Sequence, residues 1–181
     1  ISIGGGGLVY QSNDYTIIHS AQGTGSAGTV SINVAPNVTI QTQGPTSQAI
    51  NAVQLNGTGD PEVNIGKGAL IEGGSSGIGV RFGGAINTLN NEGTIQTAGG
   101  VGGRAIVSDG GVTRLNNRGL IKGSIHLKGS GNIVNNDQGG SILTSGLDLG
   151  IDSVLTNAGY VQFKSAESGL MGTVSVSGTF N

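Results

Sequence analysis

Apolar and polar residues alternate one by one in short runs along this chain. Residues 31–34 (SINV) follow the pattern, and residues 173–177 (TVSVS) repeat it near the other end. A period of two directs one face of a β-strand toward an apolar core. Gly and Asn, which favour turns, separate the runs. The pattern therefore predicts many short strands joined by tight turns.

A spacer motif recurs at the end of some of these runs. Its consensus is an apolar residue, Asn or Thr, Asn, any residue, Gly, any residue, and then Ile or Val. The clear copies are 89–95, 115–121, 134–142 (with two extra residues) and 155–161, and the diverged copies are 32–40 and 63–71. The second Asn recurs at intervals of 26, 19 and 21 residues. This irregular period suits a solenoid whose turns accept insertions.

Each repeat divides into three apolar runs. In one copy they are 105–107, 112–115 and 120–121, with Gly- or Asn-containing corners between them. Three strands and three turns describe one coil of a parallel β-helix, in which each Ile or Val stacks about 4.8 Å from its counterpart. We therefore predict an all-β fold, a right-handed single-stranded parallel β-helix with three strands per coil. At about 24 residues per coil, the chain would form about seven coils.

The same stacking would bring the second Asn of each spacer into a column. Asn tolerates the backbone conformations of tight corners, and its amide both donates and accepts hydrogen bonds. We expect a structural ladder of side-chain amides, each bonded to the next, from Asn91, Asn117, Asn136 and Asn157.

The N-terminal region differs from the repeats. It holds a run of four glycines at 4–7 and apolar runs at 8–10 and 15–19. An open strand edge invites aggregation, so a solenoid needs a cap. We expect 1–45 to be a capping coil or hairpin and 46–181 to be one continuous stretch of β-helix.

Composition narrows the class of protein. Gly contributes 37 of 181 residues, and only 10% of residues are charged. Glycine without a three-residue period excludes collagen, and β-branched residues along the whole length exclude a disordered linker. The net charge of −2 gives no general attraction to nucleic acid. Cysteine is absent, so the chain has no disulfide and no thiolate metal site.

Two sequence motifs known from cofactor-binding and catalytic sites occur here without the neighbouring secondary structure that those sites need. Residues 23–28 satisfy a dinucleotide-binding glycine pattern, but an alternating run follows them where that site needs a helix. Residues 73–77 satisfy the nucleophile-elbow pattern without its strand–turn–helix context. The acidic residues are dispersed and aromatic residues are few, unlike the grooves of β-helical polysaccharide lyases. We predict that the chain is not an enzyme and holds no metal or cofactor.

The spacers resemble those in the passenger domains of Gram-negative autotransporters (type V secretion). The strand starts Gly-Thr-Ile, Gly-Leu-Ile and Gly-Ser-Ile at 93–95, 119–121 and 140–142 carry the same resemblance, which covers 60–181 well and 1–59 loosely. It implies export through an outer-membrane β-barrel, followed by display on the bacterial cell surface or release from it. We interpret the chain as a piece of a longer precursor, and expect membrane contact only through a barrel outside this piece.

Basic residues cluster in one part of the sequence. Five of the eight Lys and Arg residues fall within 104–128, with one His among them and one Asp opposing them. Neighbouring coils would gather them into a basic strip able to hold a sulfated glycan or an acidic host protein. The candidate strip is Arg104, Arg114, Arg118, Lys122, His126 and Lys128. The alternative is that these charges only protect the surface against strand-edge pairing.

The function that these features favour is binding. We predict an adhesin or host-cell-interacting virulence module, with a host receptor, a matrix protein or a sulfated glycan as its partner. Self-association between cells and release as a soluble effector are further activities of the same class. The other classes are a stalk that presents an effector or enzyme domain located elsewhere in the precursor, and a phage tail-spike-like β-helix, which would be trimeric.

Overall fold

The computed structural model describes residues 8–11, 16–19, 30–53, 59–164 and 178–180. The glycine pattern at 23–28 lies outside these residues. Within them the regular elements are β-strands, apart from the single 3₁₀ turn η1 (Gly100–Gly102). No helix in this part of the chain is long and apolar enough to cross a membrane.

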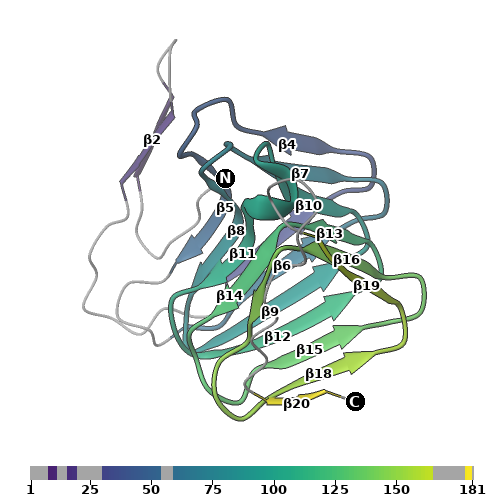
Figure 1. Ribbon diagram of the computed structural model, residues 1–181. Helices are drawn as coiled ribbons and strands as arrows, with labels where there is room; N and C mark the ends of the chain where they lie inside the picture. The colour runs from purple at the N-terminus through teal and green to yellow at the C-terminus, as the bar shows by residue number, and fades with distance from the viewer. Residues whose placement is uncertain (1–7, 12–15, 20–29, 54–58, 165–177, 181) are drawn as a thin grey trace.

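Three parallel sheets make up the body of the molecule (Figure 1). Sheet 1 contains β3 (Val30–Val34), β6 (Pro61–Ile65), β9 (Ile86–Asn91), β12 (Val112–Asn117), β15 (Ile133–Asn136), β18 (Ser153–Asn157) and β20 (Gly178–Phe180). Sheet 2 contains β4 (Thr39–Gln41), β7 (Leu70–Gly73), β10 (Thr94–Thr97), β13 (Leu120–Lys122), β16 (Ser141–Thr144) and β19 (Tyr160–Phe163). Sheet 3 contains β5 (Gln48–Val53), β8 (Ile78–Gly83), β11 (Arg104–Ser108), β14 (Ser124–Leu127) and β17 (Leu147–Asp148).

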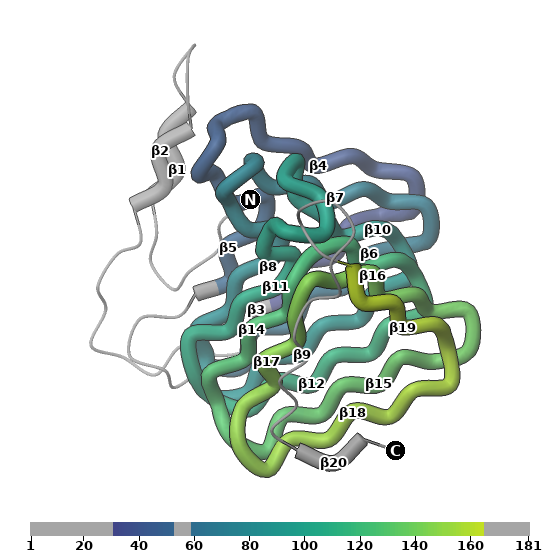
Figure 2. The backbone as a smooth tube through the Cα atoms, in the orientation of Figure 1, coloured from purple at the N-terminus to yellow at the C-terminus, as the bar shows by residue number. Residues whose placement is uncertain are grey.

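The chain visits the three sheets in the same order on every turn, as the tube in Figure 2 shows. The fold is thus a parallel β-helix with three strands per coil, which confirms the fold class predicted from the sequence. The described residues hold five complete coils and the first two strands of a sixth, and β20 pairs with β18 below them.

The parallel stack begins at Val30, where β3 pairs with β6. This start lies inside the region 1–45 that the sequence assigned to a cap. Ahead of it, β1 (Leu8–Gln11) and β2 (Thr16–His19) form an antiparallel pair. A capping role for 1–45 stays a prediction.

Like residues stack on like in the core. In sheet 2, Ile71, Ile95, Ile121 and Ile142 lie in register on successive strands, each with no exposed surface. Sheet 1 carries the buried column Val63, Leu89, Leu115, Val134 and Leu155, and sheet 3 carries Ile50, Val80, Ile106, Ile125 and Leu147. Burial of one such side chain stabilises the fold by about 1.5–3 kcal/mol. Three aliphatic columns therefore form one dry interior.

The repeat length varies in the turns from sheet 2 to sheet 3 and also in those from sheet 3 to sheet 1. Between β10 and β11 this turn spans residues 98–103 and includes η1, whereas Gly123 alone joins β13 to β14. After these turns β11 and β14 pair with a register shift between Arg104 and Ile106, beyond which Ile106 lies beside Ile125 in the core. The turns differ in length at the corners of the coil, and the apolar side chains in the core stay stacked.

The spacer glycine allows the turns from sheet 1 to sheet 2 to stack backbone on backbone. Leu120 N–H donates to the carbonyl oxygen of Gly93, one coil earlier, at 2.8 Å. A Cβ atom on Gly119 would lie only 2.0 Å from that same oxygen. A side chain at this spacer position would push the two coils apart.

We predict that Gly119→Ala lowers the free energy of unfolding by about 2–4 kcal/mol, because the added methyl group overlaps a backbone atom that cannot move alone. Gly110→Ala is the matched control, since nothing lies within 4 Å of a Cβ there. It should change stability by less than about 0.5 kcal/mol. Urea unfolding followed by circular dichroism measures both, and equal losses would contradict the turn-stacking argument.

Candidate ligand-binding site

The structure distributes the six residues of the predicted basic strip over several faces. Arg114 is exposed on the outer face of sheet 1, and Lys122 is half-buried at the end of β13 in sheet 2. Arg118 lies in the turn between those sheets. The three that meet, on the outer face of sheet 3, are Arg104, His126 and Lys128. The six residues therefore form no single strip, because one coil turns through all three faces within about two dozen residues.

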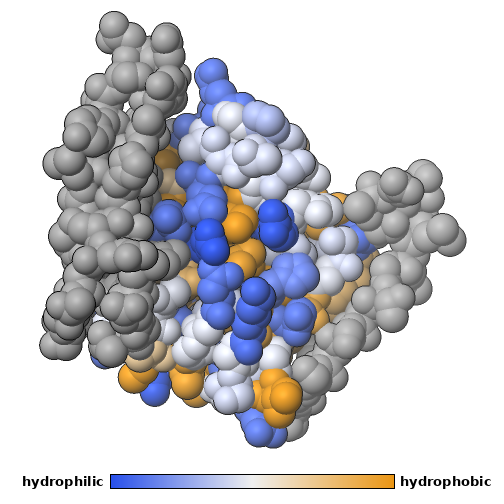
Figure 3. Space-filling view, turned by 90° about the vertical axis from the view of Figure 1, so that its left-hand side faces the viewer, coloured by the Kyte–Doolittle hydropathy of each residue, from blue (hydrophilic) through white to orange (hydrophobic). Residues whose placement is uncertain are grey.

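A hollow of about 390 Å³ lies on the outer face of sheet 3. Its charged lining residues are Arg81, Arg104, Asp109, His126, Lys128 and Asp148. Ile78 and Val107, which are 6% and 7% exposed, provide apolar surface between them. Figure 3 views the molecule from this side and shows orange apolar atoms between blue hydrophilic side chains. The hollow thus combines an apolar floor with a charged rim.

Strand alternation and coil register together build this surface. Arg81, Val107, His126 and Asp148 occupy equivalent positions on β8, β11, β14 and β17, so each coil adds one residue to an outer column. The alternating residues on either side of them face the core. Arg81 was missed in the sequence because it lies outside the basic cluster, although the alternation in 78–83 was enough to place it outside.

Asp109 holds two of the cations. Its Oδ2 lies 2.6 Å from Arg81 Nε, and its Oδ1 lies 3.7 Å from Lys128 Nζ. The side chains of Arg81, Asp109 and Lys128 are 36%, 31% and 69% exposed, and exposed pairs of this kind contribute about 0–1 kcal/mol each. The two ion pairs consequently orient the side chains more than they stabilise the fold.

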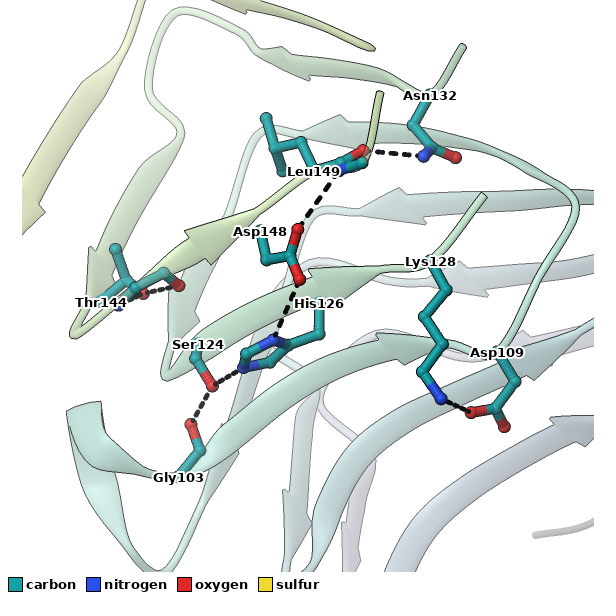
Figure 4. A network of polar contacts seen from close by, with 11 residues as sticks. Gly103, Asp109, Ser124, His126, Lys128, Asn132, Thr144, Asp148 and Leu149 are labelled. Carbon is teal, nitrogen blue, oxygen red and sulfur yellow. Dashed lines mark hydrogen bonds and ion pairs between the residues drawn. The ribbon is translucent and has the colours of Figure 1, made fainter. Parts of the chain in front are cut away.

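Ser124, His126 and Asp148 stand in the order of a catalytic triad (Figure 4). Ser124 Oγ lies 3.1 Å from His126 Nε2, and His126 Nδ1 lies 3.9 Å from Asp148 Oδ2. The last distance is too long for a hydrogen bond. Ser124 is buried, and its hydroxyl donates to the carbonyl oxygen of Gly103 at 3.1 Å. In this geometry the network orients the imidazole at the hollow and leaves the hydroxyl without the activation that a nucleophile needs.

Arg118 belongs to a separate set of charges on the turn between sheets 1 and 2. Its Nε lies 3.0 Å from Asp137 Oδ2, and its Nη1 lies 4.0 Å from Glu92 Oε1. These three residues come from successive coils, and all are well exposed. Arg118 is therefore compensated by carboxylates of the coils on either side of it.

The four spacer amides form a continuous ladder along the inner edge of sheet 1. Asn91 Nδ2 donates to Asn117 Oδ1, Asn117 Nδ2 to Asn136 Oδ1, and Asn136 Nδ2 to Asn157 Oδ1, each at 2.7 Å. Asn117 also donates to the carbonyl oxygens of Gly119 and Ser141. Asn91, Asn117 and Asn136 therefore each tie their coil to the next and also bond to the turn that follows them.

Two further polar columns were not predicted. On the outer side of sheet 1 a second amide ladder runs through Asn33, Asn64, Asn90, Asn116 and Asn135. At the corner between sheets 3 and 1, a buried network joins Asn87, Thr113, Asn132 and Ser153. The doubled Asn of the spacer signalled the first column. Each member of the second column lies four residues before the inner-ladder Asn of its own coil, but the members differ in residue type, so no repeated residue marked this column in the sequence.

We predict that Asn117→Ala costs about 3 kcal/mol of unfolding free energy, because it removes the donor to the buried Asn136 Oδ1 and leaves Asn91 Nδ2 with the 3.4 Å bond to the carbonyl oxygen of Leu120. Asn116→Ala, one residue away on the outer ladder, should cost less than about 1 kcal/mol, since water replaces the lost bonds at a half-exposed site. Chemical denaturation measures both. Comparable losses would show that the inner ladder has no special role.

No three His, Asp or Glu side chains of the described residues are grouped as a metal site. Comparisons with known proteins add no relative: the chain matches no protein-family model, no curated protein and no solved structure. The resemblance to autotransporter passenger domains therefore depends on the spacer motifs alone.

Proposed function

We propose that this chain is a binding module of a bacterial surface or secreted protein, of the autotransporter passenger type, that contacts host cells. The observation that carries the proposal is the hollow on sheet 3, where charged residues from successive coils surround apolar surface. Binding sites commonly combine apolar walls with a few placed polar groups. The chain displays this combination on an outer face, which a large partner can reach.

The location outside the cell is supported by the sequence. The spacers resemble those of exported passenger domains, and only 10% of the residues are charged, so uncharged Ser, Thr, Asn and Gln make up most of the polar side chains of the chain. Stability comes from a long cooperative stack, so the chain needs none of the disulfides that small secreted domains use. A stiff stack of this kind presents its outer faces at a fixed geometry.

We predict that the purified protein binds cultured host cells and that Arg104→Glu with Lys128→Glu weakens this binding at least about 10-fold, equivalent to about 1.4 kcal/mol. Both residues line the hollow. Arg114→Glu with Lys122→Glu makes the same change in net charge on other faces, and should alter binding by less than about 2-fold. Flow cytometry with labelled protein measures all three.

Three outcomes would contradict this proposal. Absence of binding by the unaltered protein to any cell type would favour a stalk. Equal losses of cell binding in the two double variants would show that binding depends on net charge and not on the hollow. A trimer in sedimentation equilibrium would favour the tail-spike class.

A further inference from the structure

We propose that the hollow on sheet 3 binds the sulfate and carboxylate groups of an extended anionic glycan, and that Asp109 is a built-in competitor for those groups. This inference depends on the binding function proposed above and names its ligand class. It starts from the balance of charge in the hollow. The permanent cations are Arg81, Arg104 and Lys128, opposed by two carboxylates.

Arg104 is the cation best placed to receive a ligand. Its Nη2 donates to the carbonyl oxygen of Ser76 at 3.2 Å, which fixes the guanidinium at the rim. Among the residues that the structure describes, it forms no ion pair, and it is exposed. A guanidinium binds sulfate or carboxylate oxygens through paired N–H groups. Arg104 therefore offers an anion site that is already oriented and uncompensated.

The opposite end of the hollow is an anion site already filled by the protein itself. One carboxylate, that of Asp109, serves both Arg81 and Lys128. Two cations that converge on one carboxylate define a place where an external anion is stabilised. Because the present pairs are exposed and weak, a sulfate can compete with Asp109 for the same donors.

The distance between the two ends sets the shape of the ligand. Arg104 begins β11 and Asp109 follows its last residue, so about 16 Å separates them at about 3.3 Å per residue. Val107 lies between the two ends on β11, and Ile78 lies beside Arg104 on β8. A ligand that reaches both ends is extended, with charges apart and an uncharged body that covers apolar surface.

The remaining lining groups favour a glycan over an acidic peptide. Gln48 and Asp148 also line the hollow, and a carboxylate only accepts hydrogen bonds. Sugar hydroxyls on every ring of a glycan can donate to these oxygens, whereas the side chains of an acidic peptide consist mainly of carboxylates, which only accept hydrogen bonds. The mixture of fixed cations and hydrogen-bond acceptors suits a molecule that carries both anions and hydroxyl groups.

The test is calorimetric titration of the full chain with a heparin-derived hexasaccharide. Arg104→Gln should weaken binding about 10-fold, whereas Arg114→Gln on sheet 1 should change it by less than about 2-fold. Asp109→Asn should tighten binding about 3- to 10-fold, because it frees two cations and removes a competing charge. Asp137→Asn is the matched control: it frees Arg118 away from the hollow, with the same change in net charge.

Each alternative has its own result. The proposal is overturned if Arg104→Gln has no effect, if Asp137→Asn tightens binding as much as Asp109→Asn, or if a desulfated hexasaccharide binds equally well. Polyglutamate binding at the strength of the sulfated glycan would assign the hollow to an acidic protein instead. Unfolding midpoints equal to that of the unaltered protein show that the variants are folded. Cell binding that survives without any glycan binding would reject this ligand class and leave the proposed function standing.

Discussion

Hydrogen bonding between successive coils is the constraint on which the rest of this structure depends. The parallel ladders hold neighbouring strands about 4.8 Å apart and fix which residue lies beside which. Leu89 is thereby placed on Leu115, and Asn117 on Asn136. A slip of one residue would turn the inward side chains outward, so register and core composition depend on each other.

This constraint explains how polar amides persist in a dry interior. A single buried Asn would leave donors and acceptors unsatisfied. In a column, each amide finds its partner in the next coil, as Asn91, Asn117 and Asn136 do. In the two preceding coils the same column holds Val34 and Ile65. The ladder starts at Asn91, whose Oδ1 accepts the N–H of Gly93 in its own turn. The column thus changes cleanly from aliphatic to amide.

On the outer faces the same register assembles charges that are distant in sequence. Arg81, Arg104 and Lys128 come from consecutive coils and meet at one hollow, whereas Arg114 and Arg118 are closer in sequence to Lys128 and lie elsewhere. A sheet face offers little depth, so the recognition proposed for this face depends on the arrangement of charges. The ion pairs of Asp109 with Arg81 and Lys128 orient these side chains.

The sequence by itself determined the parallel β-helix, its three strands per coil, and the corner at which the spacer amides fall. These features depend on the alternation of apolar and polar residues and on the spacer motif. Both are short sequence patterns, and they recur in successive coils. Only the tertiary structure decided that the basic cluster is divided among three faces and that Arg81 and Asp109 join Arg104 and Lys128. Turn lengths between sheets vary from Gly123 alone to residues 98–103, and they set which face each exposed residue reaches. The core selects apolar residues at inward positions, which marks those positions in the sequence, whereas no residue type marks which outward charges share a face, so the sequence predicts the interior better than the surface.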